Sequence, residues 1–553
     1  MAAIICGIFL PLLIILVVVI TRQWQLTNRR KKSKLPIPPG PKPWPLVGSF
    51  PEIFRSGKPA FRWIHNFMDE MKTEIACIRL GGTYVIPVTS PELAREFLKN
   101  QGSVFASRPV CMSADLISNG YQSSIFLPPG DKWMKMRKVL HSHVLSPAAL
   151  HWLHDKRAEE ANNLVKYIYT RCCNKISGTG AGGMHAVNVR IVSRQYCGNV
   201  ISKMVFNKRF FGNGEEEEEL LKAMFALLQT LYGFGVSDHL PWLSIFDIDG
   251  YKGIIKKAMS VMRKHLDTEV DKRVQMWKDG IKTVEQDILD VLLTLKDNAG
   301  TPLLSDTEIK TQVLEMMLAT TDNPSNAVEW ALAEMINQPK LLEKAVEEID
   351  NVVGRERLVE ESDLPKLNYV KACIKEAFRL HPVAPFNIPH VSLANTVVGG
   401  YYIPKGSQVL LSRVGLGRNA KAWEEPMMFK PERHLKEGGG EVDLNDSELK
   451  LLAFSTGSRG CPAVKLGSLM TTMLMARLLQ SFTWNLPPTL PCRSLTEAKD
   501  DLFLENPLLA SSIFLRNRSG DRELAKELLV YDLILLLSPP LAGLLFESDQ
   551  LSL

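Results

Sequence analysis

The 553-residue chain lacks the cysteine spacings that mark a disulfide framework or a thiolate zinc site. Its nine cysteines are an odd number, they are scattered along the chain, and no two stand in a Cys-x-x-Cys arrangement. These absences argue against zinc ribbons, thioredoxin-like redox sites and a disulfide-stapled fold. A single cysteine in a special setting remains a candidate for chemistry.

The chain also lacks surplus charge outside its first 34 residues. Six of its 66 Lys and Arg residues lie in that segment, which contains no acid, and the rest of the chain carries as many bases as acids. A body without net charge has no long-range attraction for a phosphate backbone, so nucleic-acid binding is not expected.

The N-terminal segment accounts for the basic block. Ala2–Ile20 is an uncharged apolar run of 19 residues, and ~20 helical residues span the hydrocarbon core of a bilayer. Because Lys and Arg follow the run, we expect a single-pass transmembrane anchor at 1–21 with the body on the cytosolic side. Residues 22–45 are then a basic flank and a proline-rich hinge. A buried core helix is the alternative.

The body, residues 46–516, is expected to be one mainly α-helical domain with small β-sheets. Glu74–Val88 predicts a hairpin, and a capping box at Ser305 opens a long helix that is expected to reach Asn337. Residues 517–553 differ in character, with charge and proline inside an apolar stretch, and predict an atypical C-terminal tail that makes a poor membrane helix.

The most specific motif is FSTGSRGCPA, Phe454–Ala463, just before a strongly periodic helix. Gly457 and Gly460 let backbone amides point at the sulfur of Cys461, and the helix that follows presents its positive end. Both effects are expected to lower the pKa of this thiol. Arg459 can pair with a carboxylate of whatever the sulfur holds. A buried cysteine in a glycine-rich turn is the alternative.

This motif resembles the haem-binding loop of the cytochrome P450 family, whose cysteine is the axial ligand of the iron of haem b. The resemblance extends to the Glu-x-x-Arg and Pro-Glu-Arg elements of that family. It implies that Cys461 is the metal ligand, and that the loop is braced by a buried ion network of structural residues. Those residues are Glu376, Arg379 and Arg433.

The resemblance also implies a set of cofactor-binding residues. Trp133 and Arg137, four residues apart, present an indole donor and a guanidinium on one helical face, as the haem-propionate helix of the family does. His390 stands where many relatives have another propionate-binding arginine. For Trp133 and Arg137 the alternative is an exposed arginine beside a core tryptophan. For His390 it is a core histidine whose hydrogen bonds are satisfied within the protein. Phe454 and Arg459 complete the set.

The long helix contains Pro324, which cannot donate to the carbonyl of Thr320, so a groove is expected around Asp322 and Asn323. In the P450 fold, oxygen sits at this groove, because the haem lies between this helix and the cysteine loop. Asn323 occupies the position of a proton-relay threonine in relatives. The resemblance therefore implies that Asp322 and Asn323 are catalytic and manage protons with ordered water.

Four strings narrow the resemblance to one branch of the family: Asp-Asn-Pro-Ser-Asn at 322–326, VAPFNIPHVS at 383–392, FKPERHL at 429–435 and FSTG-x-RGC at 454–461. Together they resemble the plant amino-acid N-monooxygenases that make aldoximes for glucosinolates and cyanogenic glucosides, over roughly residues 36–510. Arg108 is expected at the substrate pocket or the haem edge.

That branch implies an L-amino acid substrate, whose α-nitrogen is hydroxylated twice with O2 before dehydration and decarboxylation leave an oxime. It implies electrons from NADPH through a separate reductase, contact with membrane lipid, and a place in the endoplasmic reticulum membrane. The alternatives are a monooxygenase of another small plant metabolite, and a catalytically inactive haem-binding membrane protein.

Overall fold

The computed structural model describes residues 35–173, 186–212, 214–485 and 495–514. The expected anchor at 1–21, the basic flank up to residue 34 and the tail at 517–553 lie outside these residues. In the part of the chain that is described, no helix is long and apolar enough to cross a membrane.

Helices make up most of the described structure, which confirms the mainly α-helical domain of the predicted fold class. They are α2 (Phe50–Ser56), α3 (Ala60–Glu70), α4 (Pro91–Arg95), α5 (Met112–Ile117), α6 (Asp131–Val139), α7 (Pro147–Trp152), α8 (His154–Cys173), α9 (Val189–Phe206), α10 (Glu215–Tyr232), α11 (Val236–His239), α12 (Tyr251–Lys278), α13 (Ile288–Thr294), α14 (Asp306–Asn337), α15 (Pro339–Val353), α16 (Asn368–Leu380), α17 (Arg413–Gly417) and α18 (Val464–Ser481).

The strands form three small sheets. The first has the order β1-β2-β7-β4, with β2 and β7 parallel and the other pairs antiparallel. The second has the order β3-β9-β8, and the third pairs β5 with β6. Their bounds are β1 (Ile78–Leu80), β2 (Thr83–Val88), β3 (Ala186–Asn188), β4 (His390–Val391), β5 (Thr396–Val398), β6 (Tyr401–Ile403), β7 (Gln408–Leu411), β8 (Phe482–Asn485) and β9 (Leu509–Phe514).

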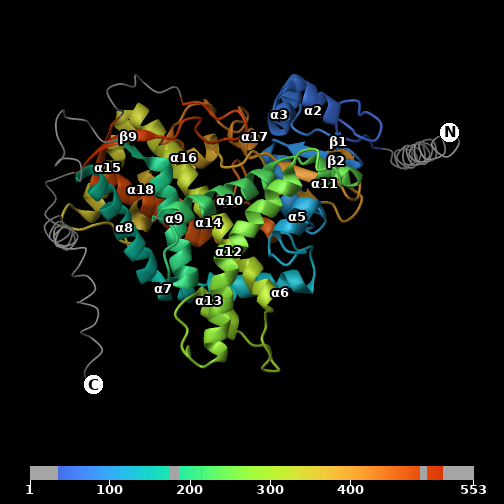
Figure 1. The fold of residues 1–553 in the computed structure, drawn as a ribbon. Helices are drawn as coiled ribbons and strands as arrows, with labels where there is room; N and C mark the ends of the chain where they lie inside the picture. Colours follow the sequence, from blue (N-terminus) through green and yellow to red (C-terminus); the bar gives the residue numbers. More distant parts are fainter. Residues whose placement is uncertain (1–34, 174–185, 213, 486–494, 515–553) are drawn as a thin grey trace.

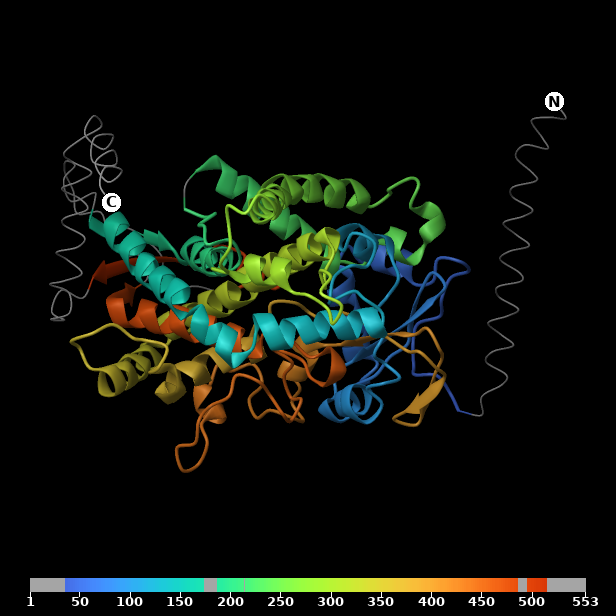
Figure 2. The same cartoon turned by 90° about the horizontal axis from the view of Figure 1, so that it is seen from below.

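The central element is α14, which packs against α9, α16 and α18 (Figure 1). The predicted capping box is present: the Ser305 side chain accepts from the amide of Glu308, and the Glu308 side chain accepts from the amide of Ser305. This box supplies acceptors for backbone N–H groups at the start of the helix, which have no partner within the helix itself. Seen from below, α14 runs between α10 and α12 on one side and the segment around residues 420–460 on the other (Figure 2).

The predicted hairpin is also present as β1 and β2, which lie beside α2 and α3 at one side of the molecule (Figure 1). The proline-rich stretch before it has no regular structure and is tied to the body. The Pro39 carbonyl accepts from the amide of Cys77 at 2.8 Å, and the Pro36 carbonyl accepts from the amide of Tyr402 at 2.8 Å.

Candidate active site

A cavity lies between α14 and the loop that carries Cys461. Its walls come from α6, from α14, from residues 382–390 and from residues 453–471. Among the described cysteines, only Cys461 lines this cavity. The structure therefore brings together the long helix and the cysteine loop, which the sequence separates by more than a hundred residues.

The cysteine loop is held by its own backbone and by contacts with Leu98 and Phe378. The amide of Cys461 donates to the Phe454 carbonyl at 2.9 Å. Gly457 has φ +73°, and a Cβ there would lie 2.5 Å from the Leu98 carbonyl oxygen, so this position requires glycine. The centroids of the Phe454 and Phe378 rings lie 5.7 Å apart, and both residues line the cavity.

The pKa of the Cys461 thiol differs from the sequence prediction. Burial raises it, whereas the amide of Ala463 and the charges of Arg137 and Arg413 act in the opposite direction. The expectation that the loop lowers this pKa is therefore wrong for the polypeptide alone, because desolvation of an anion outweighs these amides and cations. A bound metal cation would supply the missing charge.

Three arginines reach the cavity wall without an acid partner among the described residues: Arg108, Arg137 and Arg459. Burial, together with the charges of Arg459 and Arg137, lowers the pKa of Arg108 to about 9. Burial and the charge of Arg137 likewise lower the pKa of Arg459 to about 10. Such a cluster of buried cations favours an anionic ligand.

Two buried donors in this cluster have no hydrogen-bond partner among the residues that the structure describes: Nε1 of Trp133 and Nη1 of Arg459. The Arg459 guanidinium lies 4.4 Å from the centroid of the Trp133 ring, while its Nε and Nη2 donate to the carbonyls of Ala106 and Leu127 at 2.6 and 2.7 Å. The two donors are buried beside each other on the cavity wall. Haem b fits these residues, because its propionates would satisfy both donors and its iron would meet the Cys461 sulfur.

His390 lines the same cavity and is buried. Its Nδ1 lies 2.9 Å from the Phe105 carbonyl, which can only accept, so Nδ1 carries the proton. Burial and the charge of Arg108 lower the pKa of His390 to about 3. The neutral ring has the bonding of a core histidine. Its role as a propionate donor stays a prediction and would require a second proton on Nε2.

On α14, the two predicted catalytic residues point in different directions. Asn323 lines the cavity, and its Nδ2 donates to the Ala319 carbonyl at 2.9 Å. Asp322 does not line the cavity; it is buried and pairs with Arg194 of α9 at 3.2 Å. Burial raises the pKa of Asp322 to about 6 although Arg194 opposes this shift. The structure thus assigns only Asn323 to the cavity wall.

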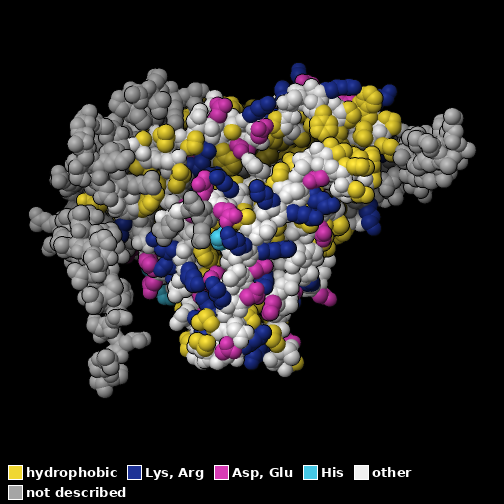
Figure 3. Space-filling model, viewed as in Figure 1, with side chains coloured by type: hydrophobic (Ala, Val, Ile, Leu, Met, Phe, Trp, Pro, Cys, Tyr) yellow, Lys and Arg dark blue, Asp and Glu magenta, His cyan; other side chains and the backbone are white. Residues whose placement is uncertain are grey.

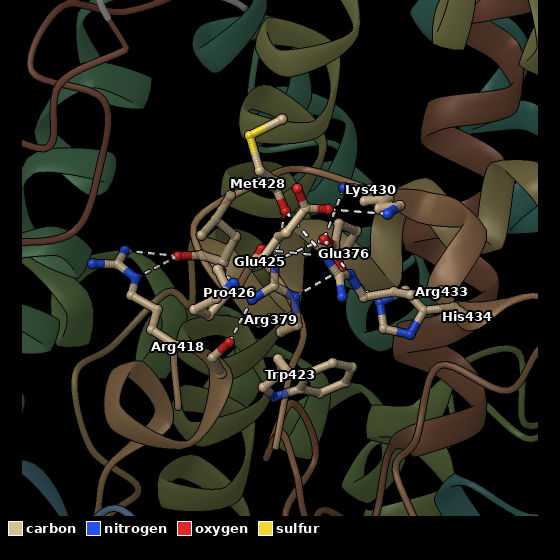
Figure 4. Close-up of polar contacts among 12 residues, drawn as sticks. Glu376, Arg379, Arg418, Trp423, Glu425, Pro426, Met428, Lys430, Arg433 and His434 are labelled. Carbon is tan, nitrogen blue, oxygen red and sulfur yellow. Dashed lines mark hydrogen bonds and ion pairs between the residues drawn. The ribbon is translucent and has the colours of Figure 1, made fainter. Parts of the chain in front are cut away.

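The predicted ion network of Glu376, Arg379 and Arg433 is present (Figure 4). Glu376 is fully buried and accepts from Arg379 at 2.7 and 2.8 Å and from Arg433 Nε at 3.1 Å. His434, which the sequence prediction missed, adds a fourth contact through Nε2 at 2.7 Å. Arg379 also donates to the carbonyls of Gly417, Pro426 and Met428, so the network fixes the chain around residues 417–434.

Glu315 and Arg413 also line the cavity and were not predicted. Glu315 had a usable signal, since it precedes Asn323 by eight residues on the same helix and so shares its face. No sequence signal pointed to Arg413. It follows β7 and reaches the cavity through tertiary packing, and its Nε donates to Asn387 Oδ1 at 2.6 Å.

Comparison with known proteins identifies relatives along most of the chain. The Cytochrome P450 family model matches residues 38–510. Isoleucine N-monooxygenase 1 of Lotus japonicus is 52% identical over 491 residues, which are 88% of this chain and 90% of that protein. Tyrosine N-monooxygenase of Sorghum bicolor is 51% identical, with 86% and 85% covered. Phenylalanine N-monooxygenase of Arabidopsis thaliana is 51% identical, with 88% and 94% covered.

A solved structure supports the fold independently. A zebra fish cytochrome P450, solved with progesterone, superposes with a TM-score of 0.66 at 22% identity and covers 81% of this chain and 98% of its own. The family model spans well over half of the chain, and the curated relatives share half of its residues. The chain therefore belongs to the cytochrome P450 family of haem-thiolate monooxygenases.

Proposed function

We propose that this protein converts an L-amino acid to an aldoxime. Two successive hydroxylations of the α-nitrogen each consume one O2 and two electrons from NADPH, delivered by a separate reductase. Loss of water and carbon dioxide then leaves the oxime. The observation that carries the proposal is the identity of about one half, over most of both chains, to N-monooxygenases of isoleucine, tyrosine and phenylalanine.

In this proposal the residues of the cavity take separate roles. Cys461 would hold the iron of a haem, which when bound supplies oxygen activation. Trp133, Arg137 and Arg459 would hold the propionates by charge-assisted hydrogen bonds. Asn323 orders water beside the substrate nitrogen. Asp322 can exchange protons with the cavity only through water or Asn323, because it is paired with Arg194.

Reconstitution tests the proposed reaction. The full-length protein, a plant NADPH-cytochrome P450 reductase and NADPH are supplied with each protein amino acid, and aldoximes are measured by mass spectrometry. We expect one or a few amino acids to yield an aldoxime. A thiolate-type reduced-CO spectrum without aldoxime from any amino acid would contradict the proposal and favour either another small metabolite or an inactive haem protein.

We also propose that the protein is held at the endoplasmic reticulum membrane, with the catalytic domain in the cytosol. Apolar side chains gather over α2, α3 and α11 (Figure 3). Residues 241–248, which follow α11, expose Trp242 by 54%, Ile245 by 81% and Phe246 by 72%. Phe50 of α2 contacts His239 of α11, so the two elements are neighbours. An apolar face of this kind suits contact with lipid beside an N-terminal anchor.

The free donor of Trp133 gives a prediction about haem binding. Trp133→Phe keeps an aromatic ring, smaller than the indole, but removes the Nε1 donor, and a lost hydrogen bond to a charged group costs ~1.5–3 kcal/mol. We expect haem to transfer to apomyoglobin roughly 10- to 100-fold faster from this variant. Trp152→Phe, at an exposed tryptophan of α7, is the matched control. Equal transfer rates for both variants would show that no propionate accepts from Trp133.

A further inference from the structure

Glu315 places a carboxyl group in the cavity wall on the same face of α14 as Asn323. Ala319 lies between them, so the three residues follow one another at four-residue intervals, and all three line the cavity. The negative charge of Glu315 acts on two other cavity residues. Burial raises the pKa of Cys461, and Glu315 raises it as well. Burial lowers the pKa of Arg137, and Glu315 opposes that shift.

The contacts of Glu315 are to neutral groups. Its Oε1 accepts from the Ser124 hydroxyl, and its Oε2 accepts from the amide of Ile125 at 3.2 Å. Within the described residues, no Lys, Arg or His forms an ion pair with it. Burial raises the pKa of its carboxyl group, although hydrogen bonds from Ser124 and Ile125 oppose the shift.

A structural role alone does not explain an acid at this position. A glutamine would satisfy both partners without the desolvation cost of a charge, because its oxygen can accept from the amide of Ile125 while its NH2 group donates to the Ser124 hydroxyl oxygen. A carboxyl group that lacks a counter-charge and faces a cavity favours a ligand that brings the positive charge with it. An amino acid carries such a charge on the nitrogen that the proposed reaction modifies.

We propose that Glu315 binds the α-ammonium group of the amino-acid substrate and orients its nitrogen toward the part of the cavity lined by α14. This inference rests on the proposed function and adds the group that recognises the substrate. The ammonium must lose a proton before its lone pair can react. Glu315 can accept that proton: an N–H bond breaks, an O–H bond forms, and a neutral amine and a neutral acid remain.

The test is Glu315→Gln in the full-length holoenzyme, which removes the charge and keeps the acceptor. Binding is measured from the Soret shift with L-phenylalanine, L-tyrosine and L-isoleucine, and with the deamino analogue of each, such as 3-phenylpropanoic acid. For the amino acid that the wild type converts, we expect the dissociation constant to rise about 30-fold or more. The deamino analogue should bind as well as before or better, since it no longer meets a like charge.

Ser124→Ala is the matched control, because it removes a donor to Glu315 but leaves the charge. If Glu315 only fastens residues 124–125, this variant should lose affinity while Glu315→Gln retains it; substrate recognition predicts the reverse order. A normal reduced-CO spectrum shows that each variant is folded. If the wild type forms aldoxime and Glu315→Gln binds the amino acid equally well, this inference alone is wrong. If the wild type converts no amino acid, the proposed function fails as well.

Discussion

Replacement of Cys461 by serine is expected to abolish both the thiolate-type reduced-CO spectrum and aldoxime formation. Cys461 is the described cysteine that lines the cavity. A serine hydroxyl at that position remains protonated and donates far less electron density to iron than a thiolate does. We therefore expect activity below the detection limit, measured as aldoxime per mole of purified protein, while haem content falls.

The control for this variant is Cys77→Ala. Cys77 is buried before β1 and lines neither of the two described pockets, so its replacement should leave the spectrum unchanged apart from a small loss of stability. A Cys461→Ser protein that keeps the thiolate-type band would show that another cysteine holds the iron.

The parts of the fold that sequence could predict are local. The capping box at Ser305, the helix from Asp306 to Asn337 and the hairpin of β1 and β2 depend on residues close together in the chain. The four-stranded sheet could not be predicted in this way. Its central pair joins Val85–Val88 to Gln408–Leu411, more than 300 residues apart, and only packing of the whole domain specifies that register.

The same limit applies to the active site. Cys461 and Glu376 stand in motifs specific enough to be found without a structure. Asp322 and Asn323 are neighbours in sequence, yet successive residues of a helix point about 100° apart, so one of them can face the cavity while the other turns away from it. Sequence could not show which one, because the rotation of α14 is set by contacts with α9 such as the Asp322–Arg194 pair.

The electrostatics of the site were the least predictable part. The loop around Cys461 has the glycines and the helix start that lower a thiol pKa, but the degree of burial depends on every wall of the cavity. The three arginines of the cavity wall, Arg108, Arg137 and Arg459, come from distant segments of the chain. Only the folded structure shows that they lie on one cavity and that none has an acid partner among the described residues. That shared lack points to the anionic cofactor more directly than any one arginine does.

The second large effect is expected on stability, at Glu376, which lies at the centre of the buried ion network. Burial would raise the pKa of its carboxyl group, but hydrogen bonds from Arg379 and His434 lower the pKa from 4.5 to about 2. The folded state therefore favours the ionised form, and the resulting stability is present above pH 4.5 and lost as the pH falls from 4.5 toward 2. A shift of this size corresponds to roughly 3 kcal/mol.

Glu376→Gln is expected to destabilise the protein by ~3–5 kcal/mol, because Arg379 would remain as a buried charge without its partner. The free energy of unfolding, followed by urea titration of the holoprotein, measures this loss. The acid-dependent fall in stability between pH 4.5 and 2 should also become shallower in the variant, since its amide does not titrate. Haem loss should accompany unfolding, because α16, which carries Glu376 and Arg379, also packs the Phe378 ring against Phe454 of the cysteine loop.

Glu425→Gln provides the matched control, because Glu425 pairs with Lys430 at 3.1 Å in the same cluster but is 54% exposed. An exposed ion pair contributes at most about 1 kcal/mol, so this variant should unfold nearly as the wild type does. If the free energy of unfolding falls by the same amount in both variants, the buried Glu376 contributes no more to stability than an exposed acid does. If Glu376→Gln loses less stability than Glu425→Gln, the buried network does not stabilise the fold.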